Sequence, residues 1–144
     1  MDSMDTVNLL KECDAGIKMA VVSIDEILEY VCDEKMKQLL QGSKAQHKKL
    51  EGELSVLLRQ HGESEKEPSP IAKGMSWMKT NMKMSMDNSD SMAAELITDG
   101  CNMGVKSLQK YLNEYQSADA QARAVCERLI SIEEKLCKDL RAYL

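Results

Sequence analysis

Apolar residues recur at steps of three and four along most of the chain, and the pattern is clearest from residue 7 to residue 31. A helix has 3.6 residues per turn, so residues at such steps lie on one face. Asp14 is the one polar member of a series that otherwise consists of Val7, Leu10, Ile17, Val21, Ile24, Leu28 and Val31. The segment therefore predicts a long amphipathic helix, capped by Asp5 or Thr6, with a carboxylate in its buried face.

A second helix with the same spacing is predicted directly after it. Asp33 can cap this helix, and Gly62 can end it in the left-handed conformation that follows many helices. The expected buried face comprises Met36, Leu40, Ser43, His47, Leu50, Leu54, Leu57 and His61. Because the connection is so short, the two helices should pack antiparallel, with His47 inside.

The next segment is charged and contains both prolines of the chain. Residues 63–70 read as a loop, and Ser69 and Pro70 form a typical helix start. A shorter helix should follow to residue 86, with one face formed by Ile71, Met75, Met78, Met82 and Met86. Methionine fills irregular space in cores that lack aromatic rings, so this face is expected to pack rather than to bind copper.

Two further long helices complete the pattern. The first should bury Ala93, Leu96, Ile97, Gly100, Met103, Gly104, Leu108, Tyr111, Leu112 and Tyr115. Gly100 and Gly104 each cost a helix about 1 kcal/mol relative to alanine, which predicts close approach of another backbone or of Trp77 there. The final helix should bury Ala122, Val125, Leu129, Ile132, Leu136, Leu140 and Tyr143, with no polar residue among them.

These elements predict an all-α fold in a single domain spanning residues 1–144. Helices are expected at about residues 6–31, 34–61, 70–86, 90–115 and 119–143. Two short connections and one long one indicate a four-helix bundle with a long crossover that contains a short extra helix, which is the ferritin-like topology. The alternative is a plain up-down-up-down bundle with the short helix packed across one end.

Composition and charge restrict the classes of function. The chain of 144 residues has no Phe and a net charge of −5 with interleaved signs, and it has no basic stripe that could follow a phosphate backbone. We therefore expect no nucleic-acid binding. No apolar run is long enough to cross a bilayer, and the first six residues do not resemble a secretory signal, so we expect a cytoplasmic protein that does not bind membranes. Five scattered cysteines are expected to be small buried residues.

Three stretches resemble a known group of proteins. They are Val7-Asn8-Leu9-Leu10, the Pro70/Gly74/Trp77 pattern, and the run from Asp99-Gly100 to Tyr111. They are similar to uncharacterised ferritin-like proteins, often bacterial, that are grouped under a domain of unknown function and are distantly similar to rubrerythrins and spore-coat ferritin-like proteins. The resemblance implies the bundle and no particular activity.

Ferritin-like proteins that bind two irons use inward Glu residues and Glu-x-x-His motifs from four helices. In this chain the matching candidates are Asp14, His47, Asp99 and Glu134, with Glu133 as an alternative to Glu134. Lys44 stands where a Glu should precede His47, and the last helix has no histidine. The ligand set is incomplete, so we expect no cofactor. Asp14 then needs another partner inside the bundle, such as Lys18 or a residue of the third long helix.

The sequence supports a non-enzymatic bundle that acts through self-association or binding to a protein partner. The alternative is a degenerate ferritin-like protein that binds iron or manganese, or an oxidase. A third hypothesis is a bundle that holds an apolar small molecule in the space left by Gly100 and Gly104.

Overall fold

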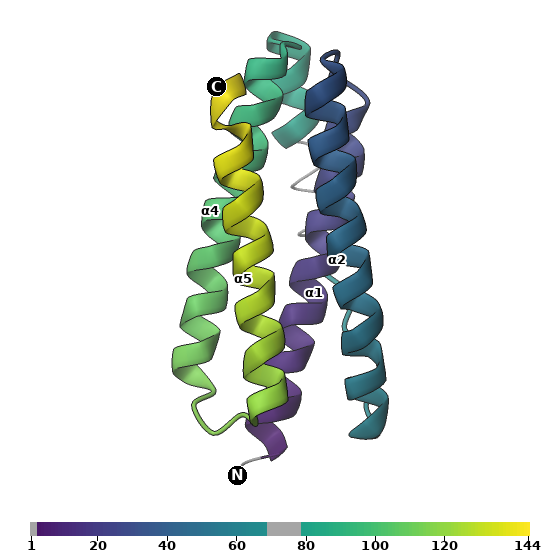
Figure 1. Ribbon diagram of the computed structural model, residues 1–144, viewed down its shortest axis with the longest axis vertical. Coiled ribbons are helices and arrows are strands. Elements are labelled where there is room, and N and C mark those ends of the chain that lie inside the picture. Colours follow the sequence, from purple (N-terminus) through teal and green to yellow (C-terminus); the bar gives the residue numbers. More distant parts are fainter. Residues whose placement is uncertain (1–2, 69–78) are drawn as a thin grey trace.

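Four long helices pack side by side in the computed structural model, which describes residues 3–68 and 79–144 (Figure 1). They are α1 (Ser3–Leu28), α2 (Glu34–Gln60), α4 (Asp90–Glu114) and α5 (Ala120–Leu140), and a short 3-10 helix, η1 (Arg141–Tyr143), follows α5. Residues 79–86 are also helical, and no strand occurs within 3–68 or 79–144. The all-α prediction is confirmed.

Hydrogen bonds at the two ends of the bundle fix the directions of the helices. At one end, Asp90 at the start of α4 accepts bonds from the backbone N–H groups of Cys32 and Asp33, between α1 and α2. At the other end, the N–H of Asp119, before α5, donates to the Thr6 hydroxyl near the start of α1, at 2.8 Å. Hence α4 runs antiparallel to α1 and parallel to α2, unlike in an up-down-up-down bundle, and the chain between α2 and α4 returns along the bundle.

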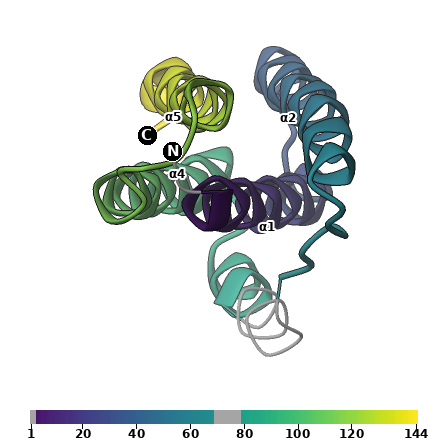
Figure 2. The same ribbon diagram turned by 90° about the horizontal axis from the view of Figure 1, so that it is seen from below.

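The end-on view shows how the helices surround the core (Figure 2). Helices α1 and α5 each contact the other three long helices. The helical residues 79–86 lie outside this group, against α1: Met84 belongs to the same buried cluster as Ile24 and Ile27, and the Tyr30 hydroxyl donates to Asn81 Oδ1 at 2.7 Å.

The apolar core consists of two clusters, one toward each end of the bundle. One contains Leu10, Ile17, Leu54, Leu112 and Leu129 with their neighbours, and the other contains Ile24, Met36, Leu40, Ile97 and Leu136 with theirs. Two buried polar side chains, His47 of α2 and Glu133 of α5, belong to neither cluster. Along α2 and α5, these two residues lie between the residues of the two clusters. A polar level therefore separates the two apolar clusters.

Most predicted helix boundaries are close to the observed ones, because local capping sets them. Asp33, Ser89 and Asp119 cap α2, α4 and α5 by accepting a backbone N–H, and Gly62 after α2 has a φ of 69°. The first helix is the exception, since it spans Ser3–Leu28 rather than residues 6–31. The predicted helix start at Ser69 and Pro70, and Trp77, lie outside the described residues.

Candidate functional site

The interior of the bundle contains a hydrogen-bonded pair formed by His47 and Glu133. His47 is fully buried, and its Nδ1 lies 2.7 Å from the carbonyl oxygen of Ser43, one turn earlier in α2. A carbonyl only accepts, so Nδ1 carries a proton. Nε2 lies 3.3 Å from Glu133 Oε1, and this bond needs one more proton, on the ring or on the carboxyl. The pair is therefore neutral overall.

The environment of His47 determines whether that proton is on the imidazole ring or on the carboxyl group of Glu133. Burial lowers the pKa of the imidazole, but the hydrogen bond and charge of Glu133, together with the Ser43 carbonyl, outweigh burial and raise the pKa. These surroundings favour the cationic, doubly protonated form of His47 beside Glu133.

Glu133 corrects the predicted buried face of α5. The prediction placed Ile132 in that face and allowed no polar residue, whereas the structure buries Glu133 and leaves Ile132 partly exposed. Steps of four and three lead from Leu129 through Glu133 to Leu136 as regularly as through Ile132, so spacing could not distinguish them. Only His47 in the facing helix offered a signal, because a buried histidine requires a polar partner.

Cys101 of α4 is a third polar group at the same level. Burial raises the pKa of its thiol, and the nearby charge of Glu133 raises the pKa further. The thiol therefore stays protonated. His47, Glu133 and Cys101 come from three different helices, so only the tertiary fold brings them together.

A cavity of about 660 Å³ lies against this polar group. Its walls are mainly α1 and α4, which present mainly small or apolar side chains, and His47 and Glu133 from α2 and α5 form its base. Pro68, Lys79 and Thr80, from the chain between α2 and α4, also line it. The described residues of the walls include Ala15, Gly16, Ala20, Ser23, Gly100, Gly104 and Ser107. Side chains this short leave the space between α1 and α4 open.

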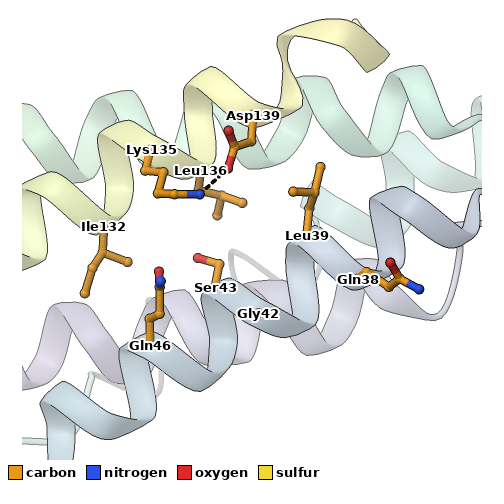
Figure 3. A pocket seen from close by; sticks show the side chains of 9 residues that line it. All are labelled: Gln38, Leu39, Gly42, Ser43, Gln46, Ile132, Lys135, Leu136 and Asp139. Carbon is orange, nitrogen blue, oxygen red and sulfur yellow. Dashed lines mark hydrogen bonds and ion pairs between the residues drawn. The ribbon is translucent and has the colours of Figure 1, made fainter.

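A smaller hollow lies between α2 and α5 (Figure 3). Ser43 and Gln46 of α2 face Ile132 and Leu136 of α5 there, and Lys135 is paired with Asp139 at its edge. Its volume is about 150 Å³, below the roughly 300 Å³ at which ligand pockets begin. Of these two, the larger cavity has the size of a ligand site.

Asp14 has a structural role at some distance from this polar pair. Its Oδ2 accepts from Lys18 Nζ at 2.7 Å and from the backbone N–H of Lys66 at 2.8 Å, while no described residue bonds Oδ1. Lys18 is also 3.3 Å from Glu65. The predicted pairing with Lys18 is confirmed. Through its bond to the Lys66 N–H, Asp14 holds the segment after α2 against α1.

The four predicted metal ligands do not form a site. Asp14 and His47 are buried as predicted, but Asp99 and Glu134 are exposed. Within residues 3–68 and 79–144 no three His, Cys, Asp or Glu side chains are placed to hold a metal ion. Asp99 does line the cavity, while the buried carboxylate of α5 is Glu133 rather than Glu134.

Other predictions also need correction. Met82 and Met86, which were expected to pack, are 61% and 84% exposed, and His61 is exposed rather than buried. A Cβ added to Gly100 would meet no described atom within 4 Å, so the expected close neighbour is not found there, and Trp77 lies outside the described residues. Met103 is 69% exposed rather than buried. Among the cysteines, Cys13, Cys101 and Cys126 are buried as expected, whereas Cys32 is exposed.

Comparisons with known proteins add no assignment. No family model matches the sequence, and neither a curated protein nor a solved structure matches the chain. None of the helices within the described parts of the chain is long and apolar enough to cross a membrane.

Proposed function

We propose that this protein is a non-enzymatic binding protein that holds an apolar small molecule in the cavity between α1 and α4. The observation that carries the proposal is the combination of a ligand-sized cavity, walls that are mainly apolar, and a buried polar group at its base. Small-molecule sites typically have this composition and a volume of about 300–1,000 Å³.

The directions of the long helices and the return of the chain between α2 and α4 support a ferritin-like bundle as the scaffold. Bundles of this kind build their sites from side chains on facing helices at mid-height. His47 and Glu133 lie at that level. We propose that this level serves ligand binding in a bundle without a complete set of metal ligands.

Metal binding, the alternative prediction, receives less support. Both ring nitrogens of His47 are already hydrogen-bonded, and among the described residues neither Cys101 nor any other side chain completes a set of three metal ligands with the pair. Elemental analysis of the purified protein tests this alternative. Stoichiometric iron or manganese that is lost in His47→Ala would contradict our proposal.

The proposal is tested with Nile red, a neutral apolar dye whose fluorescence rises in apolar sites. We expect saturable binding at one site per chain, and displacement by long-chain lipids that also raise the melting temperature. Ala20→Phe places a ring in the cavity and should abolish binding. Ala45→Phe on the exposed face of α2 is the matched control and should bind as the wild type does. Absence of saturable binding in the wild type would refute the proposal.

Self-association or binding of a protein partner is a second candidate, favoured by exposed methionines. Met82 and Met86 are 61% and 84% exposed, and methionine surfaces adapt to varied partners. Light scattering tests assembly directly. A dimer that dissociates in Met82→Ser/Met86→Ser would support this candidate, and a monomer at all concentrations would contradict self-association.

A further inference from the structure

The polar base of the cavity restricts which head group a ligand can carry. Glu133 is 7% exposed as a residue, and a Cβ placed on Gly104 would lie 3.7–3.9 Å from its carboxylate. A carboxylate has about four acceptor positions, and His47 uses only one of them. Because Gly104 has no side chain, nothing of α4 covers the carboxylate at that point. Acceptor positions are therefore left for a ligand.

Both ring nitrogens of His47 are already in use at this base. His47 directs Nδ1–H to the Ser43 carbonyl and Nε2 to Glu133. An anionic head group would thus meet a carboxylate with no free imidazole N–H beside it. An ammonium group would gain little, since the imidazolium already balances the charge of Glu133, and it would lose its hydration.

The remaining charged groups on the described walls also disfavour a charged head group. Glu12 and Asp99 are acidic, and Lys79 is the basic residue among the described side chains that line the cavity. Together with Glu133 and His47 they give three acidic and two basic groups. A neutral head group avoids both the repulsion by the carboxylates and the cost of removing a charge from water.

We infer that the ligand is an apolar molecule with a neutral hydroxyl head group, a long-chain or isoprenoid alcohol, which donates its hydrogen bond to Glu133. This inference rests on the proposed function, because it assigns the ligand class of the same cavity. A hydrogen bond to a buried carboxylate is among the stronger ones, and its loss should weaken binding by about tenfold or more.

The experiment compares dodecanol with dodecanoate in displacing Nile red at neutral pH. We expect dodecanol to bind at least about tenfold more tightly than dodecanoate. Glu133→Gln should reduce that preference, and Glu134→Gln, which changes an exposed neighbour in the same helix, should keep it.

A second variant, Gly104→Ala, keeps the test informative if Glu133→Gln does not fold. Gly104→Ala favours the helix and places a methyl group over the carboxylate, so it should also reduce the preference for dodecanol. Gly52→Ala, at an exposed position of α2 with no atom near the added Cβ, is its control and should keep the preference.

The outcomes separate the two proposals. If Nile red, dodecanol and dodecanoate all fail to bind, the proposed function fails and the inference fails with it. If dodecanol and dodecanoate displace the dye equally, or dodecanoate displaces it better, the cavity binds apolar molecules but the hydroxyl assignment is wrong. An unchanged preference in both Glu133→Gln and Gly104→Ala would also overturn the assignment to Glu133.

Discussion

Replacing Asp14 by alanine tests whether the buried carboxylate stabilises the fold. The change removes two hydrogen bonds, from the Lys18 ammonium and from the backbone N–H of Lys66. A hydrogen bond to a charged group contributes about 1.5–3 kcal/mol. The net loss is less than twice that value, because Lys18 keeps Glu65 at 3.3 Å and because the variant no longer buries a carboxylate.

We expect a loss of about 2–3 kcal/mol in the free energy of unfolding. For a chain of this size that lowers the melting temperature by roughly 6–10 °C. Urea unfolding followed by circular dichroism measures the free energy. Hydrogen exchange adds a local measurement, since the amide of Lys66 should lose its protection in Asp14→Ala.

Asp25→Ala provides the matched control on the same helix. Asp25 pairs with Lys44 at 2.6 Å, but its side chain is 49% exposed. Exposed ion pairs contribute about 0–1 kcal/mol, so this variant should be close to the wild type. If Asp14→Ala were no more destabilising than Asp25→Ala, or if Lys66 kept its protection, the structural role of Asp14 would be refuted.

The remaining predictions concern the polar pair and two glycines. Because the folded state raises the pKa of His47 above its ordinary value of 6.5, its proton stabilises the fold below about that pH, and this stabilisation is lost as the pH rises through the folded pKa. The stability advantage of the wild type over Glu133→Gln, measured by urea unfolding, should thus be largest in mild acid and shrink toward alkaline pH; a constant difference would contradict the pairing. Gly100→Ala should stabilise the protein by about 0.5–1 kcal/mol, since its Cβ meets no described atom within 4 Å. Gly62→Ala should destabilise it by about 1 kcal/mol, because the φ of 69° disfavours a side chain. The melting temperature should rise in Gly100→Ala and fall in Gly62→Ala. A shift of the same sign and size in both variants would refute the reasoning.

Much of the architecture follows from local information in the sequence. Steps of three and four placed most of the buried face of α2, but Leu58 is buried in place of Leu57, and His61 is exposed. Asp33, Ser89 and Asp119 mark helix starts, because capping depends on a side chain and an N–H two or three residues away. Such interactions require no knowledge of the remaining fold, so the sequence alone determined these elements.

The site depended on the tertiary structure. Periodicity allows either Ile132 or Glu133 in the buried face of α5, and the choice is made by His47 on another helix. The sequence singled out Asp14 and His47 as buried polar residues, but only the packing shows that Lys66 bonds one and Glu133 the other. Contacts between residues far apart in the chain depend on how the helices rotate against each other, and local spacing leaves that rotation undetermined.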